Sequence, residues 1–279
     1  MNRRQKELFY FFLFRVCALT VAGFLVILVG YILINGIGAI NWAFLTEYPR
    51  KNNTAGGIFP AILGTLYLMA LVTLIAVPLG VFTAVYVTEY QRDSWWKSLL
   101  RIVIHNLAGV PSIVYGLLGL GLFVFALGMG FGLVASALTL SLLVLPLIIT
   151  ASREALHAVP QSLREASFAL GATKWQTVRH HVLPYAMPGV LTGIILSVSR
   201  AAGETAPILL TGVVYTMVGP PRLDAFMALP YHLFTIATQT ANAPQQVQYG
   251  TALVLLIMVV GINLGAIIMR NRYREKYKW

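Results

Sequence analysis

The stretch IVIHNLAGVPSIVYGLLGLGLFVFALGMGFGLVASALTLSLLVLPLIITAS, residues 102–152, contains no Asp, Glu, Lys or Arg. As one α-helix it would be about 75 Å long, because a helix rises about 1.5 Å per residue, whereas the hydrocarbon core of a membrane is about 30 Å thick. We therefore expect two membrane-spanning helices here. The glycines Gly128, Gly130 and Gly132 mark the predicted turn between them.

Four other apolar segments flank this stretch and complete the predicted membrane body. They cover residues 16–34, 58–88, 187–210 and 249–269. The first segment is longer than the apolar part of an ordinary signal peptide and no small-residue cleavage site follows it, so we expect a retained helix. The sequence therefore predicts an all-α polytopic membrane protein with six transmembrane helices.

The composition agrees with a membrane protein, since 58% of the 279 residues are hydrophobic and only 10% are charged. Soluble domains carry about 45–50% apolar and about 25% charged residues. A soluble fold, a disordered chain and nucleic-acid binding as a main role are excluded. A single cysteine, Cys17, excludes an internal disulfide.

The basic residues divide unevenly between the two sides that six spans would create. One side receives only Arg50, Lys51 and Arg222, and Arg200 lies within a span. The other side receives the remaining Lys and Arg residues: Arg3, Arg4, Lys6, Arg15, Arg92, Lys97, Arg101, Arg153, Arg164, Lys174, Arg179, Arg270, Arg272, Arg274, Lys276 and Lys278. The positive-inside rule places this richer side in the cytoplasm, with both termini.

The predicted organisation has three parts. Residues 1–56 form a cytoplasmic tail, the first transmembrane helix and an outer loop. Residues 57–270 form the transmembrane core, and residues 271–279 form a basic cytoplasmic tail. Within the core, residues 151–185 form the only sizeable cytoplasmic loop.

Two short helices are expected in this cytoplasmic loop. Ser162 and Glu165 match a capping box and Gly171 suits a helix end, while Thr173 and Gln176 match a second box and Pro184 is expected to end the second helix. Helices of about nine residues are marginal alone in water, so they must pack on something. The residues leave open whether that is this chain's own helix ends or a cytoplasmic partner.

This loop resembles the EAA motif of ABC-importer permeases of the MetI-like type. The matching residues are Glu165, Ala166, Ser167, Gly171, Leu183 and Pro184. Ser167 stands in place of the second alanine and His181 in place of an aliphatic residue, although Val182 is adjacent. The resemblance implies the ABC type I importer permease fold over roughly residues 57–270, with loop helices that dock into a cleft of a separate ATPase.

Three longer stretches resemble phosphate-importer permeases of the PstA type. They are NLAGVPSIVYGL (residues 106–117), VPQSLREASFALGATKWQTVRHHVLPYAMPGVLTGI (residues 159–194) and SRAAGETAPILLTG (residues 199–212). The resemblance implies phosphate import across a prokaryotic cytoplasmic membrane. It implies, besides membrane lipid, a PstC-like permease subunit, an ATPase dimer and an extracytoplasmic phosphate-binding protein as partners, and no nucleic acid. Other oxyanions such as sulfate, molybdate or phosphonate, and an ATP-independent channel, remain alternatives.

Arg200 and Glu204 are four residues apart inside a predicted span, which puts them on one helix face. A charged side chain near the bilayer centre costs at least about 2.5–3.5 kcal/mol of insertion free energy, so a structural or functional role must offset this cost. One interpretation is an ion pair that fixes helix packing. The other is a transport pathway in which Arg200 offers donors to an oxyanion and Glu204 moderates its grip.

Two further features concern helix geometry. Pro111 has no N–H for the carbonyl of Leu107, so a kink or break is expected there, with Ser112 and Tyr115 as nearby polar groups. Gly189 and Gly193 form a G-x-x-x-G pair, which permits close helix contact.

Motifs for catalysis are missing from the sequence. It contains no G-x-x-x-x-G-K-[ST] nucleotide-binding loop and no G-x-S-x-G or H-E-x-x-H motif. Its five histidines have no metal-ligand spacing. We therefore expect a transport subunit that is not an enzyme and holds no cofactor or metal, with ATP and Mg²⁺ bound by the partner ATPase.

Overall fold

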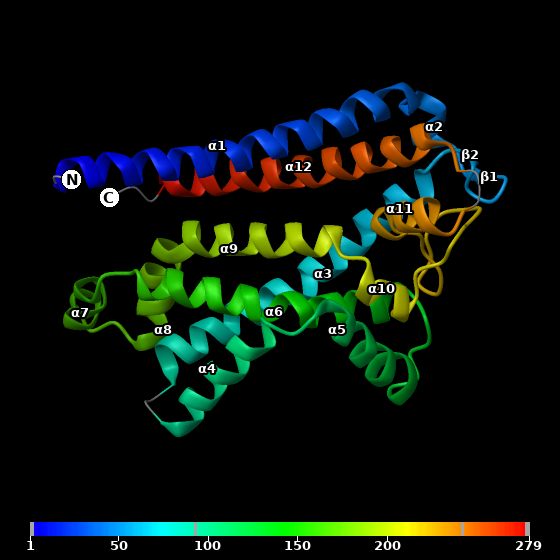
Figure 1. Ribbon diagram of the computed structural model, residues 1–279. Coiled ribbons are helices and arrows are strands. Elements are labelled where there is room, and N and C mark those ends of the chain that lie inside the picture. Colours follow the sequence, from blue (N-terminus) through cyan, green and yellow to red (C-terminus); the bar gives the residue numbers. More distant parts are fainter. Residues whose placement is uncertain (1–2, 92–93, 241–242, 277–279) are drawn as a thin grey trace.

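The computed structural model describes residues 3–91, 94–240 and 243–276, and its architecture is all-α apart from one small hairpin (Figure 1). Its α-helices are α1 (Arg3–Gly36), α2 (Trp42–Thr46), α3 (Phe59–Val85), α4 (Trp95–Leu107), α5 (Ser112–Gly119), α6 (Leu133–His157), α7 (Gln161–Ala169), α8 (Lys174–Thr177), α9 (Leu183–Gly203), α10 (Ala206–Thr211), α11 (Leu229–Thr238) and α12 (Gln245–Lys276). Shorter elements are the 3₁₀ turn η1 (Ile37–Ala39), the π-helical turns η2 (Tyr86–Tyr90), η3 (Leu120–Ala126) and η4 (Val178–Val182), and the antiparallel strands β1 (Pro49–Arg50) and β2 (Ala55–Gly56). Arg92 and Lys278 lie outside the described residues.

Among the described residues, five continuous helices are long and apolar enough to cross a membrane, and a bent pair of helices supplies the candidate for the sixth span. The continuous ones cover Phe9–Ala39, Phe59–Tyr90, Leu133–His157, Lys174–Gly203 and Gln245–Glu275. Between the second and third of these lie α4 and the helix Ser112–Ala126, which meet at an angle of 105°. The all-α membrane fold is therefore confirmed, with a bent pair in the third position.

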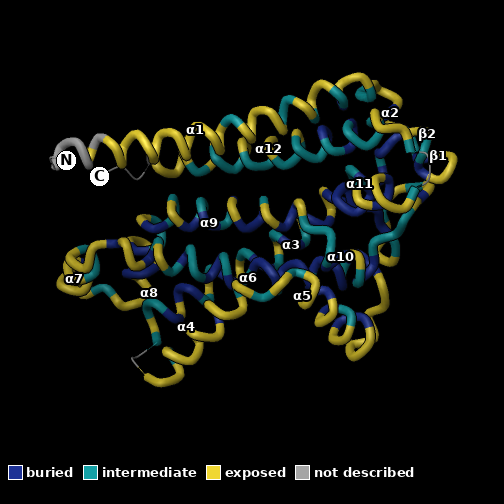
Figure 2. Tube along the Cα trace, viewed as in Figure 1, coloured by how far each residue is buried: buried dark blue, intermediate teal, exposed yellow. Residues whose placement is uncertain are grey.

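The core forms around α6, which packs against α3 and α9 (Figure 2). In contrast, α1 is exposed along most of its length and packs mainly against α12, beside which it runs (Figures 1 and 2). Exposed apolar side chains cover α1 and much of α4 and α5. In a membrane this surface contacts lipid or other subunits, because hydrocarbon carries no penalty for it.

The break in the third span follows from Pro111. This residue has no N–H, and Leu107, four residues earlier, ends α4. The Leu107 carbonyl instead accepts from the Val110 N–H (3.2 Å) and from the Tyr115 hydroxyl (2.8 Å). These two donors replace the helical bond that Pro111 cannot make, so the carbonyl is satisfied inside the membrane.

The turn between the third and fourth spans lies at the predicted glycine cluster. Gly128 and Gly130 adopt left-handed conformations, with φ of 63° and 73°, which residues other than glycine adopt only at a cost. Helix α6 begins at Leu133, directly after Gly132.

Two predicted helix boundaries are wrong. The fifth span, predicted to end at residue 210, ends at Gly203, and a separate helix α10 follows. Pro207 explains this end, since it has no N–H for the Gly203 carbonyl and its ring would clash there. Pro184 does not end the second loop helix either, because one continuous helix runs from Lys174 to Gly203. The π turn η4 lies just before Pro184, and in it the Leu183 N–H bonds the Val178 carbonyl. This wider turn lets the helix continue through the proline.

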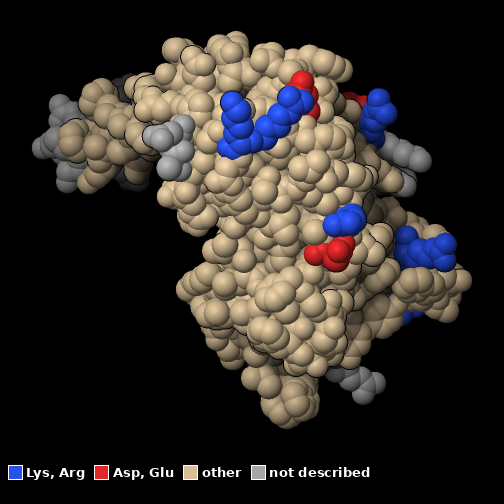
Figure 3. All heavy atoms as spheres, turned by 90° about the vertical axis from the view of Figure 1, so that its right-hand side faces the viewer, with Lys and Arg blue, Asp and Glu red and all other residues tan. Residues whose placement is uncertain are grey.

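The end of the molecule that holds α2, the hairpin and α11 is held together by polar contacts. Asn53 donates from Nδ2 to the Tyr215 carbonyl (2.9 Å), and the Tyr215 hydroxyl lies 2.7 Å from Oγ1 of Thr240. Figure 3 shows this end, on which charged side chains are sparse.

Helices α6 and α9 approach closely through small residues. A Cβ added at Gly193 would overlap the Cβ of Ala151, and one at Gly189 would lie 2.7 Å from the Cβ of Ala155. The G-x-x-x-G spacing on α9 thus faces two alanines spaced by four on α6, the arrangement that lets helix backbones approach.

We expect Gly193→Val to destabilise the protein by about 1–3 kcal/mol, because the added methyl groups must push α9 away from α6. Gly265→Val on α12 is the matched control, since nothing lies within 4 Å of a Cβ there. Thermal unfolding of the purified protein in detergent measures both. Equal losses in the two variants would mean that the helix backbone, and not the α6–α9 contact, carries the effect.

Candidate functional site

The loop helices α7 and α8 lie at the same end of the molecule as the start of α1 and the end of α12 (Figure 1). Helix α7 begins at Gln161, and its N-cap is Pro160, which makes no side-chain cap. The predicted capping box of Ser162 and Glu165 is therefore wrong, since Ser162 already lies within the first turn. A proline is well suited to the start of a helix because its φ is preset.

The end of α7 is the predicted glycine. Gly171 has φ of 81°, its N–H bonds the Phe168 carbonyl (2.9 Å), and the Ala172 N–H bonds the Ser167 carbonyl (3.2 Å). These two bonds form a Schellman motif, which requires a left-handed residue at this position. The chain thereby reverses sharply into α8.

Helix α8 begins with the predicted second capping box. Thr173 Oγ1 accepts from the Gln176 N–H, and Gln176 Oε1 accepts from the Thr173 N–H (2.8 Å). Ser167 is buried and its hydroxyl lies 2.9 Å from Oγ1 of Thr177. The serine that departs from the EAA pattern therefore ties α7 to α8.

The outer surface of this loop carries three large apolar side chains. Phe168, Leu170 and Trp175 are exposed, Leu170 to 90%, and Glu165 and Ala166 are exposed beside them. His181 is also exposed, whereas Val182 is fully buried and takes the packing role that an aliphatic residue would have there. Leu183 and Pro184 lie partly buried at the start of α9. An exposed cluster of large apolar side chains on short helices marks an interaction surface.

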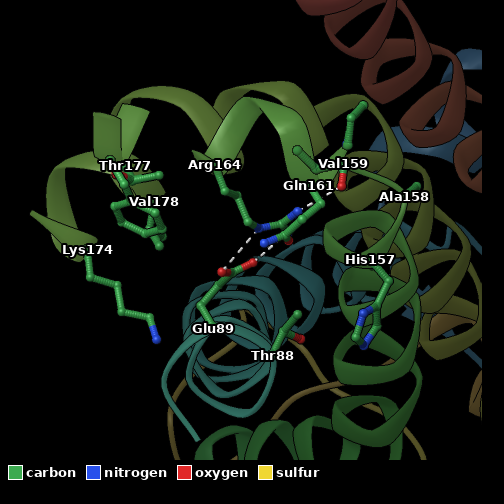
Figure 4. A pocket seen from close by; sticks show the side chains of 12 residues that line it. Thr88, Glu89, His157, Ala158, Val159, Gln161, Arg164, Lys174, Thr177 and Val178 are labelled. Atoms are coloured by element: carbon green, nitrogen blue, oxygen red, sulfur yellow. Dashed lines mark hydrogen bonds and ion pairs between the residues drawn. The ribbon is translucent and has the colours of Figure 1, made fainter. Parts of the chain in front are cut away.

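An ion pair that the sequence did not reveal fixes α7 to η2, the turn that continues α3 (Figure 4). Arg164 donates to Glu89 through Nη2 (2.8 Å) and Nε (3.4 Å), and to the carbonyls of Leu156 and Val159. The two charged side chains are only 12% and 9% exposed. Glu89 is a lone acid at the end of an apolar span, which signals a buried partner, but spacing does not show which arginine provides it.

A hollow of about 670 Å³ opens beside this ion pair (Figure 4). Thr88, His157, Gln161 and Lys174 line it together with the pair. Arg164 donates hydrogen bonds to the Glu89 carboxylate and to both carbonyls at once. The pair therefore holds the loop in a fixed position against the transmembrane helices.

Arg200 and Glu204 lie where α9 stops, away from the loop. Arg200 belongs to the last turn and Glu204 is the C-cap, and Nε of Arg200 lies 3.4 Å from Oε1 of Glu204. Arg200 is 49% exposed and Glu204 is 18% exposed. The pair is formed as the spacing suggests, but Glu204 no longer has helical backbone angles. Helix α9 ends well short of the end of the molecule that holds the hairpin (Figure 1). The pair at the end of α9 therefore lies between the two ends of the molecule.

The structure divides the predicted site residues into two groups. Tyr115, which bonds across the break at Pro111, lies in one core cluster with Ala201 and Ala202, the neighbours of Arg200. The loop residues pack at the opposite end of α9, around Val178 and Val182. One continuous helix, Lys174–Gly203, connects the two groups.

Comparison with known proteins agrees with this fold. Residues 76–274 match the family model of the binding-protein-dependent transport system inner membrane component. The chain is 38% identical over 221 residues to the phosphate transport system permease protein PstA 1 of Mycobacterium tuberculosis (strain CDC 1551 / Oshkosh), covering 77% of this chain and 71% of that protein. It is 32% identical to the probable ABC transporter permease protein YqgI of Bacillus subtilis (strain 168), covering 95% of each.

Solved structures share the fold at lower identity. A chain of a bacterial ABC transporter involved in the import of alginate matches with a TM-score of 0.66 at 13% identity, covering 97% of this chain and 99% of that one. A chain of the MetNI methionine ABC transporter matches with a TM-score of 0.60 at 20% identity, covering 77% and 97%. The chain therefore belongs to the family of binding-protein-dependent transport system inner membrane components, the permeases of ABC importers.

Proposed function

We propose that this chain is a permease subunit of an ATP-driven ABC importer that carries inorganic phosphate across the prokaryotic cytoplasmic membrane. The single observation that carries the choice of phosphate is the identity of 38% to a protein named for phosphate transport, over more than two thirds of both chains. Its partners are a PstC-like permease subunit, two copies of an ATPase and an extracytoplasmic phosphate-binding protein. Both termini and the α7–α8 loop lie in the cytoplasm.

The loop is the surface on which the ATPase acts. Its exposed apolar side chains, Phe168, Leu170 and Trp175, provide the area that a partner buries. The Schellman turn and the Ser167–Thr177 bond hold α7 and α8 in one orientation, and the Arg164–Glu89 pair links them to η2, which continues α3. Closure of the ATPase around bound ATP then moves the loop as a unit, and α3 and α9 transmit this movement to the pathway, which opens outward. ATP hydrolysis resets it.

Arg200 is the residue that faces the passing anion. A guanidinium offers five N–H donors in a planar fork that suits a tetrahedral oxyanion. Its half-exposed position leaves some of those donors free for substrate, while the 3.4 Å contact to Glu204 orients the side chain and weakens its hold. That moderation suits a transporter, because a tight site would trap its substrate.

Uptake of labelled phosphate tests the proposal directly. Cells that lack their own phosphate importers should accumulate phosphate only when this chain and its neighbouring subunits are both restored. Excess sulfate and molybdate should not compete. If the assembled complex hydrolyses ATP but moves sulfate, molybdate or phosphonate, the assignment as an ABC importer stands and the assignment of phosphate as its substrate is wrong.

We expect Arg200→Gln to lower phosphate uptake by at least about tenfold, the typical loss when a hydrogen bond from a charged donor is removed. The matched control is Arg222→Gln, which removes the same charge from an exposed side chain whose ion pair is with exposed Asp224. Copurification with the partner subunits shows whether both variants assemble. Normal uptake by Arg200→Gln rules out the pathway role, and failure to assemble assigns the pair to helix packing.

We expect Gly171→Val to uncouple ATP hydrolysis from uptake, whereas Gly171→Asn should retain both. Nothing lies within 4 Å of a Cβ at this position, so neither side chain clashes with a neighbour. The two variants therefore differ in how readily their backbone adopts the left-handed conformation. Valine in the left-handed region costs roughly 1–2 kcal/mol, while asparagine adopts it readily. ATPase activity stimulated by the binding protein and phosphate uptake are measured in reconstituted vesicles. Unchanged uptake in Gly171→Val would show that the loop does not transmit the movement.

A further inference from the structure

A second hollow, of about 360 Å³, lies between α4 and the C-terminal part of α6. Its polar lining comes from both helices: Arg101, His105 and Asn106 on α4, and Thr150, Arg153 and Glu154 on α6. It is separate from the Arg164–Glu89 hollow and from the Arg200–Glu204 pair, and neither the loop nor the pathway described above uses it.

The two arginines of this hollow have no partner in the described part of the chain. Neither Arg101 nor Arg153 forms a hydrogen bond or an ion pair among residues 3–91, 94–240 and 243–276. Arg153 is partly buried, and its Nε is fully shielded from solvent without an acceptor. A buried, unpaired guanidinium N–H is costly, so this atom calls for an acceptor that the chain does not supply.

Glu154 lines the same hollow but does not neutralise it. It is exposed and forms no ion pair with either arginine within the described residues. Two arginines and one glutamate leave the site net positive, and the Asn106 amide adds a neutral group that is able to donate hydrogen bonds. This donor-rich set suits an anion with several acceptor oxygens.

The surroundings of the hollow are typical of a membrane interface, which the proposed topology makes the cytoplasmic one. Helix α4 begins with Trp95 and Trp96, which are exposed and stacked with ring centroids 4.0 Å apart. Ile102 and Val103 are exposed farther along the same helix. Exposed tryptophans beside basic residues are typical of the interface, where phospholipid headgroups lie.

We infer that the hollow between α4 and α6 binds a phosphate group, held by Arg101 and Arg153. The group is presented either by an anionic phospholipid of the cytoplasmic leaflet or by free inorganic phosphate. Both carry oxygens that accept from two guanidinium forks.

Thermal unfolding of the purified importer complex in detergent tests this site and separates the two sources. The probes are dioctanoyl phosphatidylglycerol, dioctanoyl phosphatidylcholine and inorganic phosphate, each titrated until the midpoint stops rising. We expect phosphatidylglycerol or inorganic phosphate to raise the midpoint saturably. Arg153→Gln and Arg101→Gln should each weaken that ligand about tenfold or more, the usual effect of losing a hydrogen bond to a charged group.

Arg272→Gln is the matched control, since it removes an exposed charge near the end of α12, outside the hollow. Stabilisation that survives Arg101→Gln and Arg153→Gln, or that is the same with phosphatidylcholine, overturns the inference, as does the absence of saturable stabilisation by any probe. Phosphate binding that is lost in Arg200→Gln and kept in Arg101→Gln also overturns it, because the anion then binds in the pathway. If Arg153→Gln fails to fold, the ligand titration of Arg101→Gln, which changes an exposed side chain, provides the test.

Discussion

The fold depends on one constraint, the lack of water inside a membrane. Every backbone N–H and C=O in hydrocarbon must find its partner within the protein. The break at Pro111 obeys this rule, since the Tyr115 hydroxyl and the Val110 N–H bond the Leu107 carbonyl. Many hydroxyl groups of the helices also find a partner within the protein. Thr150, Thr192 and Thr211 each donate to the carbonyl four residues earlier, as do many other hydroxyls in these helices.

Where this constraint acts on whole segments, the sequence was sufficient to predict the fold. Long charge-free runs located the spans, the glycines at 128–132 located a turn, and Gly171 and Thr173 located a helix end and a helix start. Where the outcome depends on a local exchange of hydrogen bonds, the sequence was not sufficient. The π turn before Pro184 and the helix end before Pro207 both follow from proline, yet one helix continues and the other stops. Only the neighbouring geometry distinguishes them.

The candidate site shows the same division. The Arg200–Glu204 pair and the loop motif are local in sequence, so spacing found them. Glu89 and Arg164 are far apart in sequence, and the fold alone brings them together. The same holds for Arg101 and Arg153, which tertiary packing places around one hollow. Charged groups that meet across helices are therefore the part of the site that a single sequence leaves undetermined.

The contact between α6 and α9 has a mechanical consequence. Gly189 and Gly193 face Ala155 and Ala151, so no large side chain from these four positions projects into the neighbouring helix. Interlocked ridges must separate before two helices slide, whereas a smooth contact allows shear without loss of packing. Helix α9 carries the loop at one end and Arg200 at the other, so the movement of the loop that the proposed coupling requires would displace Arg200 along this contact.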